Sequence, residues 1–482
     1  MVIGAGFAGI TIASRLLQQG VTDLTVLERQ PGVGGVWRAN TYPGAACDVP
    51  SSLYSWSFAP YSGWVHRYAR QPQILEYIES QASSLGVEPY IRTNAEVASA
   101  TWNEAQARWD VELTSGDRLE ADVVISSVGQ LSRPATPRLE GLETFAGEVF
   151  HSAEWNHEVD LRGRTVAVVG TGASAIQFVP AIAETVTSMT VFQRSAPYVI
   201  PKADRRYTRL HHAIFGRWPR TQKVGRRTTF FLSEWLNRAL TEGSFLSKIL
   251  MVAWRLHLRH QVKDAGLRKR LVPDYPMGCK RLLFSNDWYR ALNRPDVDVV
   301  TEHIAAVEPT GIRDAAGRLH PCDVIIFGTG FKATEFLAPM QIVGREGRSL
   351  SEEWSAGAYA YLGITVPSFP NLFVMYGPNT NLGGSSILGM LEAQAAHICQ
   401  AVGRLRALGP GSSMSVTRAA AHTFDDEIQQ RLSHSAWTSC TSWYREDSGR
   451  ITTNWPGLVA EYIQRAGSFQ PDDYDCVEGS AR

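Results

Sequence analysis

The chain has 482 residues, which is too long for a single hydrophobic core and predicts two or three domains. Lysine plus arginine balance aspartate plus glutamate at 47 each, so the net charge gives no argument for nucleic acid or a membrane as a partner. The longest apolar runs are far shorter than the roughly 20 residues of a membrane span, and no secretion signal opens the chain. We therefore expect a cytoplasmic protein.

Six cysteines are scattered along the chain, without a CxxC pair or the spacing of a metal site. This pattern is typical of a reduced compartment and predicts neither disulfides nor a bound metal ion. It also argues against a two-nucleotide disulfide reductase, which needs a redox pair of cysteines.

The first 30 residues predict a strand, a glycine turn, a helix and a second strand. The first strand is short, or else the protein starts upstream of Met1. The turn is a GxGxxG of Gly4, Gly6 and Gly9, and Glu28 ends the second strand. Such a turn brings backbone N–H groups to a pyrophosphate, and an acid at the strand end accepts hydrogen bonds from ribose hydroxyls. The unit therefore predicts an ADP ribose without a 2′-phosphate, as in FAD or NAD.

A glycine- and aromatic-rich stretch follows at 34–48. Its pattern is GGxWxxxxYPGxxxD, formed by Gly34, Gly35, Trp37, Tyr42, Pro43, Gly44 and Asp48. Backbone of this kind can lie flat against a planar ring system. Asp48 is a lone carboxylate among apolar neighbours, and we expect it to need a partner. Farther on, residues 88–119 alternate apolar and polar positions between turn signals, which predicts a β-meander inserted in the first domain.

Residues 164–194 repeat the order of the first unit. Gly170, Gly172 and Ala175 form GxGxxA, and Arg194 stands where Glu28 stands in the first unit. An arginine cannot accept from ribose hydroxyls, but it pairs with a 2′-phosphate, so this unit predicts NADP. Two apolar runs that end in glycine, 121–134 and 321–333, are predicted to carry the chain between the units. The alternative is a pair of ordinary doubly wound turns without a ligand.

The stretch 205–281 is strongly basic, with eighteen Lys or Arg against four acids, and its apolar spacing is helical. We expect a helical insertion whose basic face is simply solvated near an anionic cofactor. The other interpretation is a basic amphipathic surface that rests on membrane lipid. Lys280 and Arg281 close the stretch beside Gly278. Lys280 is predicted to join Arg194 on the 2′-phosphate and Arg281 to pair with Asp48; taken singly, each of these charges is equally typical of a protein surface.

The sequence resembles the type I Baeyer–Villiger monooxygenases, which are class B flavoprotein monooxygenases, over essentially its whole length. The family fingerprint is FxGxxxHxxxW followed by Pro or Asp. Phe145, Gly147, His151 and Trp155 match it, and Asn156 departs at the last position. The second family pattern, [AG]GxWxxxx[FY]P[GM]xxxD, is matched in full at 34–48. Later stretches such as "LFVMYGPNTNLGG" are similar to the 4-hydroxyacetophenone monooxygenase branch.

The resemblance implies FAD and NADPH as cofactors, and a small apolar ketone and O2 as substrates. A C4a-peroxyflavin would attack the ketone carbonyl, and the resulting Criegee adduct would rearrange to an ester or lactone. It makes Arg281 and Asp48 the catalytic pair, while the fingerprint residues belong to a hinge region outside the chemistry. The implied cofactor-binding residues are Gly4, Gly6, Gly9, Glu28, Gly35, Val36, Trp37, Asp48, Tyr54, Val97, Gly170, Thr171, Gly172, Ser174, Ala175, Arg194, Lys280 and Asn379.

We therefore expect an α/β protein with two Rossmann-like domains, for FAD and NADP, and a helical insertion in the second. The predicted limits are 1–134 and 331–482 for the two parts of the FAD domain, and 135–330 for the NADP domain with its insertion at about 205–275. Trp443 and the aromatics of 51–58 are candidates for a substrate pocket, although most are expected in the core. Alternatives are an N- or S-oxygenating flavin monooxygenase, which usually has Tyr or Phe where Trp155 stands, and a non-catalytic nucleotide-binding regulator.

Overall fold

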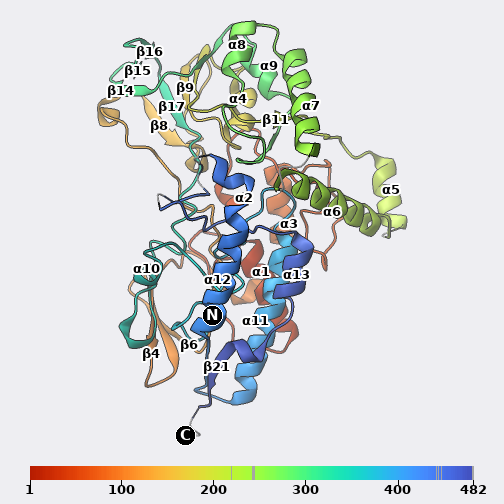
Figure 1. Cartoon of the computed structure of the whole chain (residues 1–482), viewed down its shortest axis with the longest axis vertical. Helices are drawn as coiled ribbons and strands as arrows, with labels where there is room; N and C mark the ends of the chain where they lie inside the picture. Colours follow the sequence, from red (N-terminus) through yellow and green to blue (C-terminus); the bar gives the residue numbers. More distant parts are fainter. Residues whose placement is uncertain (219, 242–244, 441, 443, 447, 480–482) are drawn as a thin grey trace.

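The computed structural model describes residues 1–218, 220–241, 245–440, 442, 444–446 and 448–479. Two parallel sheets organise the chain, as expected for two nucleotide-binding domains (Figure 1). The first sheet has the order β19-β7-β1-β2-β3. Its strands are β1 (Val2–Ile3), β2 (Val26–Leu27), β3 (Ile91–Arg92), β7 (Val124–Ser126) and β19 (Leu372–Val374). Although β1 is short, both of its residues are buried between β2 and β7.

The second sheet has the order β13-β10-β9-β17-β8 and is parallel throughout. Its strands are β8 (Glu148–His151), β9 (Thr165–Val169), β10 (Ser188–Phe192), β13 (Val297–Val300) and β17 (Val324–Phe327). Nearly all side chains of β9 and β17 are buried, as expected for central strands covered on both faces.

Smaller sheets border these two. The predicted meander is confirmed as the antiparallel strands β4 (Val97–Asn103), β5 (Arg108–Leu113) and β6 (Arg118–Ala121), with β18 (Gln341–Val343) added beside β4. The remaining strands are β14 (Ile304–Glu308), β15 (Gly311–Asp314), β16 (Leu319–Pro321), the pair β11 (Val199–Ile200) and β12 (Leu283–Phe284), and the pair β20 (Ser413–Val416) and β21 (Tyr474–Val477).

The helices divide between the two halves of the molecule (Figure 1). The half with the first sheet holds α1 (Phe7–Gln18), α2 (Val36–Ala39), α3 (Gln71–Ser84), α10 (Leu350–Glu353), α11 (Leu388–Leu408), α12 (Arg418–Ser433) and α13 (Val459–Ala466). Helix α11 is buried on most sides between α1 and α13, which explains why its apolar residues show no strong one-sided pattern.

The half with the second sheet holds α4 (Ala175–Ile182), α8 (Ala265–Arg270) and α9 (Trp288–Leu292). The predicted helical insertion is confirmed as α5 (Arg209–Arg217), α6 (Arg220–Thr241), α7 (Phe245–Gln261) and α8. Helices α5 and α6 extend from the side of the molecule in Figure 1. Among the described residues, no helix is long and apolar enough to cross a membrane.

Two chain crossings connect the halves, and they lie side by side. Pro134 and Phe331 form an antiparallel bridge, Ala135 N–H donates to Gly330 O at 2.9 Å, and Lys332 N–H donates to Arg133 O at 3.0 Å. The two crossings are therefore tied to each other as a short two-stranded connection between the halves.

Candidate active site

The first glycine loop approaches its neighbours too closely for any larger residue. Gly4 has φ of +103°, and a Cβ there would lie 2.7 Å from Ser127 O. A Cβ on Gly9 would lie 1.8 Å from Gly4 O. The loop therefore holds helix α1 tightly against β1, so that the free N–H groups at the start of α1 face the turn where a pyrophosphate binds.

Glu28 lies directly after β2 and turns back toward this loop. Its Oε2 accepts a hydrogen bond from Ala5 N–H at 2.7 Å, and its Oε1 accepts from Gln30 N–H at 2.9 Å. The carboxylate is buried, so the two backbone donors stabilise its charge in place. The carboxylate therefore lies where the sequence places the ribose of the first nucleotide, and its contact with that ribose stays a prediction.

The predicted ring-binding stretch packs beside the same loop. Gly35 Cα lies 3.5 Å from the position of a Cβ on Gly6, and Val36 begins α2. Trp37 Nε1–H donates to Tyr54 OH at 3.0 Å, and burial raises the pKa of Tyr54. The glycine contact and the aromatic pair together form an apolar border with one fixed hydroxyl, and contact of this border with a cofactor ring stays a prediction.

Two predicted cofactor residues have other roles in the fold. Val97 begins β4 and is buried in the core next to β1 and β2. Asn379 has φ of +55° and donates both amide protons, to Ile451 O at 2.9 Å and Asn454 O at 3.1 Å. Its side chain therefore fixes the C-terminal loops, and a cofactor contact from its backbone stays a prediction.

The second glycine loop repeats the geometry of the first. Gly170 has φ of +105°, and a Cβ there would lie 2.6 Å from Gly328 O on the neighbouring crossing. Thr171 Oγ1–H donates to Ser195 O at 3.1 Å, which ties the loop to the segment after β10. Ser174 and Ala175 begin α4.

Arg194 and Lys280 form a cationic corner beside this loop. Arg194 is exposed just beyond β10, and Lys280 Nζ donates to Ser195 Oγ at 2.9 Å. Burial and then the charge of Arg194 lower the pKa of Lys280, so the two cations lie close enough to repel. A dianionic phosphate would relieve that repulsion, and the corner therefore fits the 2′-phosphate of NADP.

Arg281 and Asp48 are brought together from positions far apart in the sequence. Arg281 donates from Nε at 3.1 Å and from Nη2 at 2.8 Å, both to Asp48 Oδ2. Their side chains are 32% and 21% exposed, so the pair is half-buried and still reachable. Asp48 raises the pKa of Arg281, which keeps the guanidinium charged. Within the described residues, Nη1 makes no hydrogen bond and is free to meet an anion.

The surroundings of Arg281 include residues that were not expected from the sequence. A small pocket beside it is lined by Asn237, Gly278, Lys280, Leu282, Gly383 and Trp437. Tyr444 and Tyr376 are close enough to interact electrostatically with Arg281, and burial raises the pKa of Tyr444 to about 12. No local motif marks these residues, because segments far apart in the sequence supply them. Trp56 is in the core, as expected, and Trp443 lies outside the described residues.

A family model matches residues 1–342, and its description is "Flavin-binding monooxygenase-like". The chain belongs to the flavin-binding monooxygenase-like family. A Baeyer–Villiger monooxygenase of Streptomyces coelicolor is 42% identical over 99% of this chain and 92% of its own length. One of Pseudomonas aeruginosa is 40% identical over 98% of this chain and 90% of its own. These relatives confirm the resemblance to Baeyer–Villiger monooxygenases.

Solved structures share the whole fold of this flavin-binding monooxygenase-like chain. An oxidized steroid monooxygenase bound to NADP is 31% identical and superimposes with a TM-score of 0.87 over 99% of both chains. A closed cyclohexanone monooxygenase is 26% identical, with a TM-score of 0.87 over 99% of this chain and 98% of its own. The expected pair of Rossmann-like domains with a helical insertion is therefore confirmed.

In this member of the family, the fingerprint residues lie beside the two crossings. His151 ends β8 and is buried; its Nδ1 accepts from Ala153 N–H at 3.1 Å, and its ring lies 6.0 Å from that of Phe331. Burial lowers the pKa of His151, which favours the neutral imidazole. Trp155 packs 5.5 Å from Phe178 of α4. Both residues thus connect the second glycine unit to the junction.

The other two fingerprint residues serve the sheet. Gly147 directly precedes β8. A Cβ on this residue would lie 2.2 Å from the backbone oxygen of Asp323, the residue just before β17. Phe145 packs in the apolar cluster under β9 and β17. His151 and Trp155 of the fingerprint lie at the junction, and their role as a hinge outside the chemistry stays a prediction.

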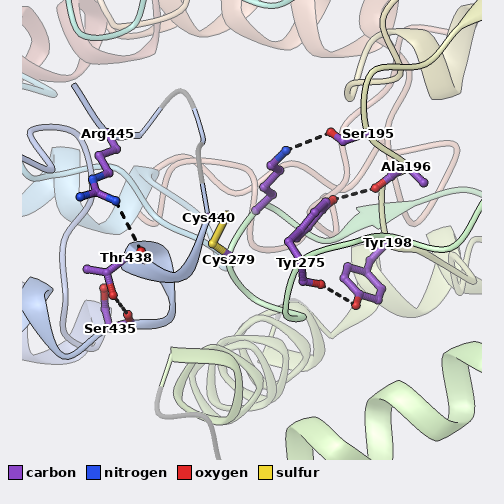
Figure 2. Close-up of a disulfide and its surroundings, with 10 residues drawn as sticks. Ser195, Ala196, Tyr198, Tyr275, Cys279, Ser435, Thr438, Cys440 and Arg445 are labelled. Atoms are coloured by element: carbon purple, nitrogen blue, oxygen red, sulfur yellow. Dashed lines mark hydrogen bonds between the residues drawn. A yellow bond between two sulfur atoms is a disulfide. The ribbon is translucent and has the colours of Figure 1, made fainter. Parts of the chain in front are cut away.

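The expectation that the chain contains no disulfide is wrong. Cys279 and Cys440 are bonded, with their Cα atoms 6.2 Å apart (Figure 2). They are 161 residues apart and belong to no cysteine motif, so only the tertiary fold brings them together. Cys47, Cys322, Cys399 and Cys476 are free.

Proposed function

We propose that this protein is an FAD-containing, NADPH- and O2-dependent monooxygenase that inserts one oxygen atom next to a ketone carbonyl, giving an ester or lactone. The observation that carries the proposal is the half-buried Arg281–Asp48 pair beside the cationic corner of Arg194 and Lys280. The named Baeyer–Villiger relatives and the NADP-bound steroid monooxygenase support it.

The residues present fit both cofactors. Glycine loops with no room for a Cβ precede α1 and α4, a buried carboxylate ends β2, and two cations follow the second loop. We assign FAD to Gly4, Gly6, Gly9, Glu28 and the stretch 34–48, and NADPH to 170–175, Arg194 and Lys280. When bound, the reduced flavin supplies the electrons and the site at which O2 is activated.

The chain's own contribution to the reaction is electrostatic. Attack on a ketone carbonyl places negative charge on oxygen, and a fixed guanidinium stabilises that charge without donating a proton to the nucleophile. Asp48 occupies Nε and Nη2 of Arg281, which fixes the direction of Nη1. We therefore assign Arg281 as the catalytic residue and Asp48 as the residue that orients it.

The domain limits predicted above, 1–134, 135–330 and 331–482, and the cytoplasmic location belong to the same proposal. The second candidate function is N- or S-oxygenation by the same cofactors. Trp155 and the Arg281–Asp48 pair favour ketone oxidation over it.

A substrate panel tests the proposal. The holoenzyme is given NADPH and O2 with linear, cyclic, aryl and steroid ketones, and with a tertiary amine and a thioether in parallel. We expect at least one ketone to gain 16 mass units as an ester or lactone. Oxygenation of the amine or thioether alone would assign the enzyme to the second candidate function, and NADPH oxidation without any FAD spectrum would refute both.

A further inference from the structure

Helices α6 and α7 expose an unusual amount of apolar surface. Of the sixteen exposed large apolar side chains in the described residues, ten lie between residues 210 and 256. Trp235 is 59% exposed and Leu256 is 60% exposed. Single exposed apolar side chains are normal, whereas a concentration of them in one part of the chain marks an interaction site.

The exposed side chains follow helical spacing and form one stripe on each helix. We call them the insertion stripes: Val224, Phe231, Leu232 and Trp235 on α6, and Phe245, Ile249, Val252 and Leu256 on α7. The spacings of three, four and seven place each set on one face. The other face of α7 is already packed, since Trp254 and Leu258 are buried. The stripes are therefore additional to the contacts that hold the helices.

Positive charge surrounds the stripes. The exposed cations on the two helices are Arg220, Lys223, Arg227, Lys248, Arg255 and Arg259. The carboxylate of Glu234 is buried and accepts from Ala460 N–H at 3.1 Å, so no described carboxylate of α6 or α7 is exposed. Arg227 lies 5.7 Å from the ring of Phe231, which places a cation directly beside an exposed apolar group.

A cleft next to the α7 stripe concentrates this charge. It has a volume of about 240 Å³ and is lined by Arg255, Leu258, Arg259, Ala265, Arg268, Lys269 and Val272. Within the described residues, none of its four cations makes an ion pair. Four unpaired cations around a partly apolar cleft match the phosphate and the adjoining carbon chain of a lipid headgroup.

We propose that α6 and α7 dock on an anionic phospholipid surface, with the insertion stripes at the acyl boundary and the α7 cleft on a headgroup phosphate. A second copy of the same face is disfavoured, because a two-fold contact would place like charges against each other. Docking does not depend on the proposed function. If the enzyme oxidises apolar ketones, docking also brings it to the lipid in which they concentrate. Asn237 of α6 lines the pocket of Arg281, so the docked helix lies beside the candidate active site.

Vesicle flotation with the holoenzyme tests the proposal. We expect binding to vesicles that contain phosphatidylglycerol, little binding to pure phosphatidylcholine, and release when salt rises from about 0.05 to 0.5 M because surface charges are then screened. Each positive charge near an anionic surface strengthens binding roughly fivefold. Replacing Arg255, Arg259 and Lys269 together by glutamine should therefore weaken binding about 100-fold. The double variant Trp235→Ser/Leu256→Ser should lose vesicle binding, because it removes one apolar side chain from each stripe.

The matched control is Val477→Ser, an exposed valine on β21 outside the insertion. Flavin content and melting temperature show that each variant is folded. No flotation of the wild type at low salt would overturn the proposal, as would stripe variants that bind like the wild type. Concentration-dependent dimers that Trp235→Ser disperses would assign the stripes to a second copy and also overturn it.

The Cys279–Cys440 disulfide lies directly beside the two cations of the active site. Cys279 precedes Lys280 and Arg281, and Cys440 follows the turn Ala436–Ser439, whose Trp437 lines the pocket of Arg281. The bond therefore joins the segment that carries both cations to the C-terminal region of the chain (Figure 2).

The same segment is held on its other side by the chain after β10. Tyr275 OH donates to Ala196 O at 2.9 Å, and Tyr198 OH donates to Tyr275 O at 2.8 Å (Figure 2). Lys280 Nζ lies 4.5 Å from the ring centre of Tyr275. These hydrogen bonds, the one from Lys280 to Ser195 and the pairing of β12 with β11 fix the segment to the second domain, and the disulfide fixes it to the C-terminal region.

We infer that this disulfide is a positioning element for Lys280 and Arg281. A dithiol reductant that breaks the disulfide should therefore weaken NADP+ binding and lower the rate of oxygenation. In the step, one S–S bond breaks, two electrons and two protons pass from the dithiol to Cys279 and Cys440, and the dithiol becomes a cyclic disulfide. The segment then keeps its contacts with the second domain and the hydrogen bonds of Arg281 with Asp48, but it loses its covalent link to the C-terminal region. Because the inference concerns oxygenation as well as NADPH binding, it rests in part on the proposed function.

Thiol titration provides the first test. The denatured, unreduced protein should show four thiols, those of Cys47, Cys322, Cys399 and Cys476, and six after reduction. For Cys440→Ser, we expect the Kd of NADP+ to rise about tenfold, which is the effect of one hydrogen bond to a charged group. Ester formed per NADPH should fall, by up to about 100-fold if Arg281 moves by roughly 1 Å.

The control is Cys476→Ser, because Cys476 is exposed and free. Wild-type holoenzyme in dithiothreitol should reproduce the Cys440→Ser effects while keeping its flavin, and reoxidation should reverse them, so the inference is tested even where the variant folds poorly. Six thiols without reductant would refute the disulfide. Unchanged NADP+ affinity in both Cys440→Ser and the reduced wild type would refute the positioning role of the disulfide, whether or not any ketone is oxidised.

Discussion

The most direct test of the candidate active site is Arg281→Ala. In the structure, Nε and Nη2 of Arg281 are held by Asp48, and Nη1 is directed elsewhere. The substitution removes the only guanidinium that the described pocket presents, and leaves the glycine loops and the corner at Arg194 unchanged. Cofactor binding and flavin reduction should therefore survive, while oxygenation should fail.

The expected loss can be estimated from the geometry. Arg281 acts as one fixed donor toward developing negative charge, and removal of one such donor costs about 10² to 10³ in rate, or roughly 3 to 4 kcal/mol of transition-state stabilisation. Because the pair is half-exposed, water screens part of the charge, and we expect the lower end of that range. Arg281→Lys keeps the charge but loses the two-point contact with Asp48, and should be intermediate.

The assay separates the two half-reactions. Flavin reduction is followed by the loss of its visible absorbance when NADPH is added without O2. Ester formed and hydrogen peroxide released are then measured with O2 and a ketone that the wild type accepts. We expect unchanged flavin reduction, ester formation reduced about 100-fold, and most NADPH electrons released as peroxide.

A double-mutant cycle with Asp48→Ala checks that the two residues act as a unit. If Asp48 only orients Arg281, the double variant should lose little more than Arg281→Ala alone. Wild-type ester formation in Arg281→Ala would refute the assignment. Independent, additive losses would refute the role given to Asp48.

Four further predictions follow from the same structure. Arg194→Ala should raise the KM for NADPH more than that for NADH, and equal increases would mean that Arg194 does not contact the 2′-phosphate. His151→Ala should lower the ester formed per NADPH consumed, because it removes the contact with the crossing at Phe331; unchanged coupling would make the residue a packing element only. Gly9→Ala should yield protein without flavin, since its Cβ would lie 1.8 Å from a loop carbonyl, and a normal flavin spectrum would contradict this. His397 is fully buried and burial lowers its pKa from 6.5 to about 4, so the unfolded chain binds its proton first as the pH falls. Stability should therefore drop between about pH 6.5 and 4, by about 3 kcal/mol at most, and His397→Gln should flatten that part of the urea-midpoint profile.

Much of the fold was predictable because its evidence is local. Each nucleotide unit places its strand, glycine turn, helix and second strand within about 30 residues, so the residue after the second strand is located by counting. Glu28 and Arg194 lie just beyond β2 and β10 for this reason. The basic, helical character of 205–281 was equally visible, because composition and helical spacing need no tertiary contact.

Spacing alone did not reveal what these elements face. The stripes of α6 and α7 look like core-facing residues in the sequence, and only the fold shows that Trp235 and Leu256 are exposed while Trp254 is buried. Helical periodicity identifies a face, but burial depends on which other element packs against it.

By itself, the sequence determined the two glycine units and the family patterns around them, since these depend on residues within one or two turns of each other. Only the tertiary structure decided which distant groups meet. It joined Asp48 to Arg281 across 233 positions and Cys279 to Cys440 across 161. The physical reason is that such contacts are formed by the packing of whole domains, and no local propensity records them.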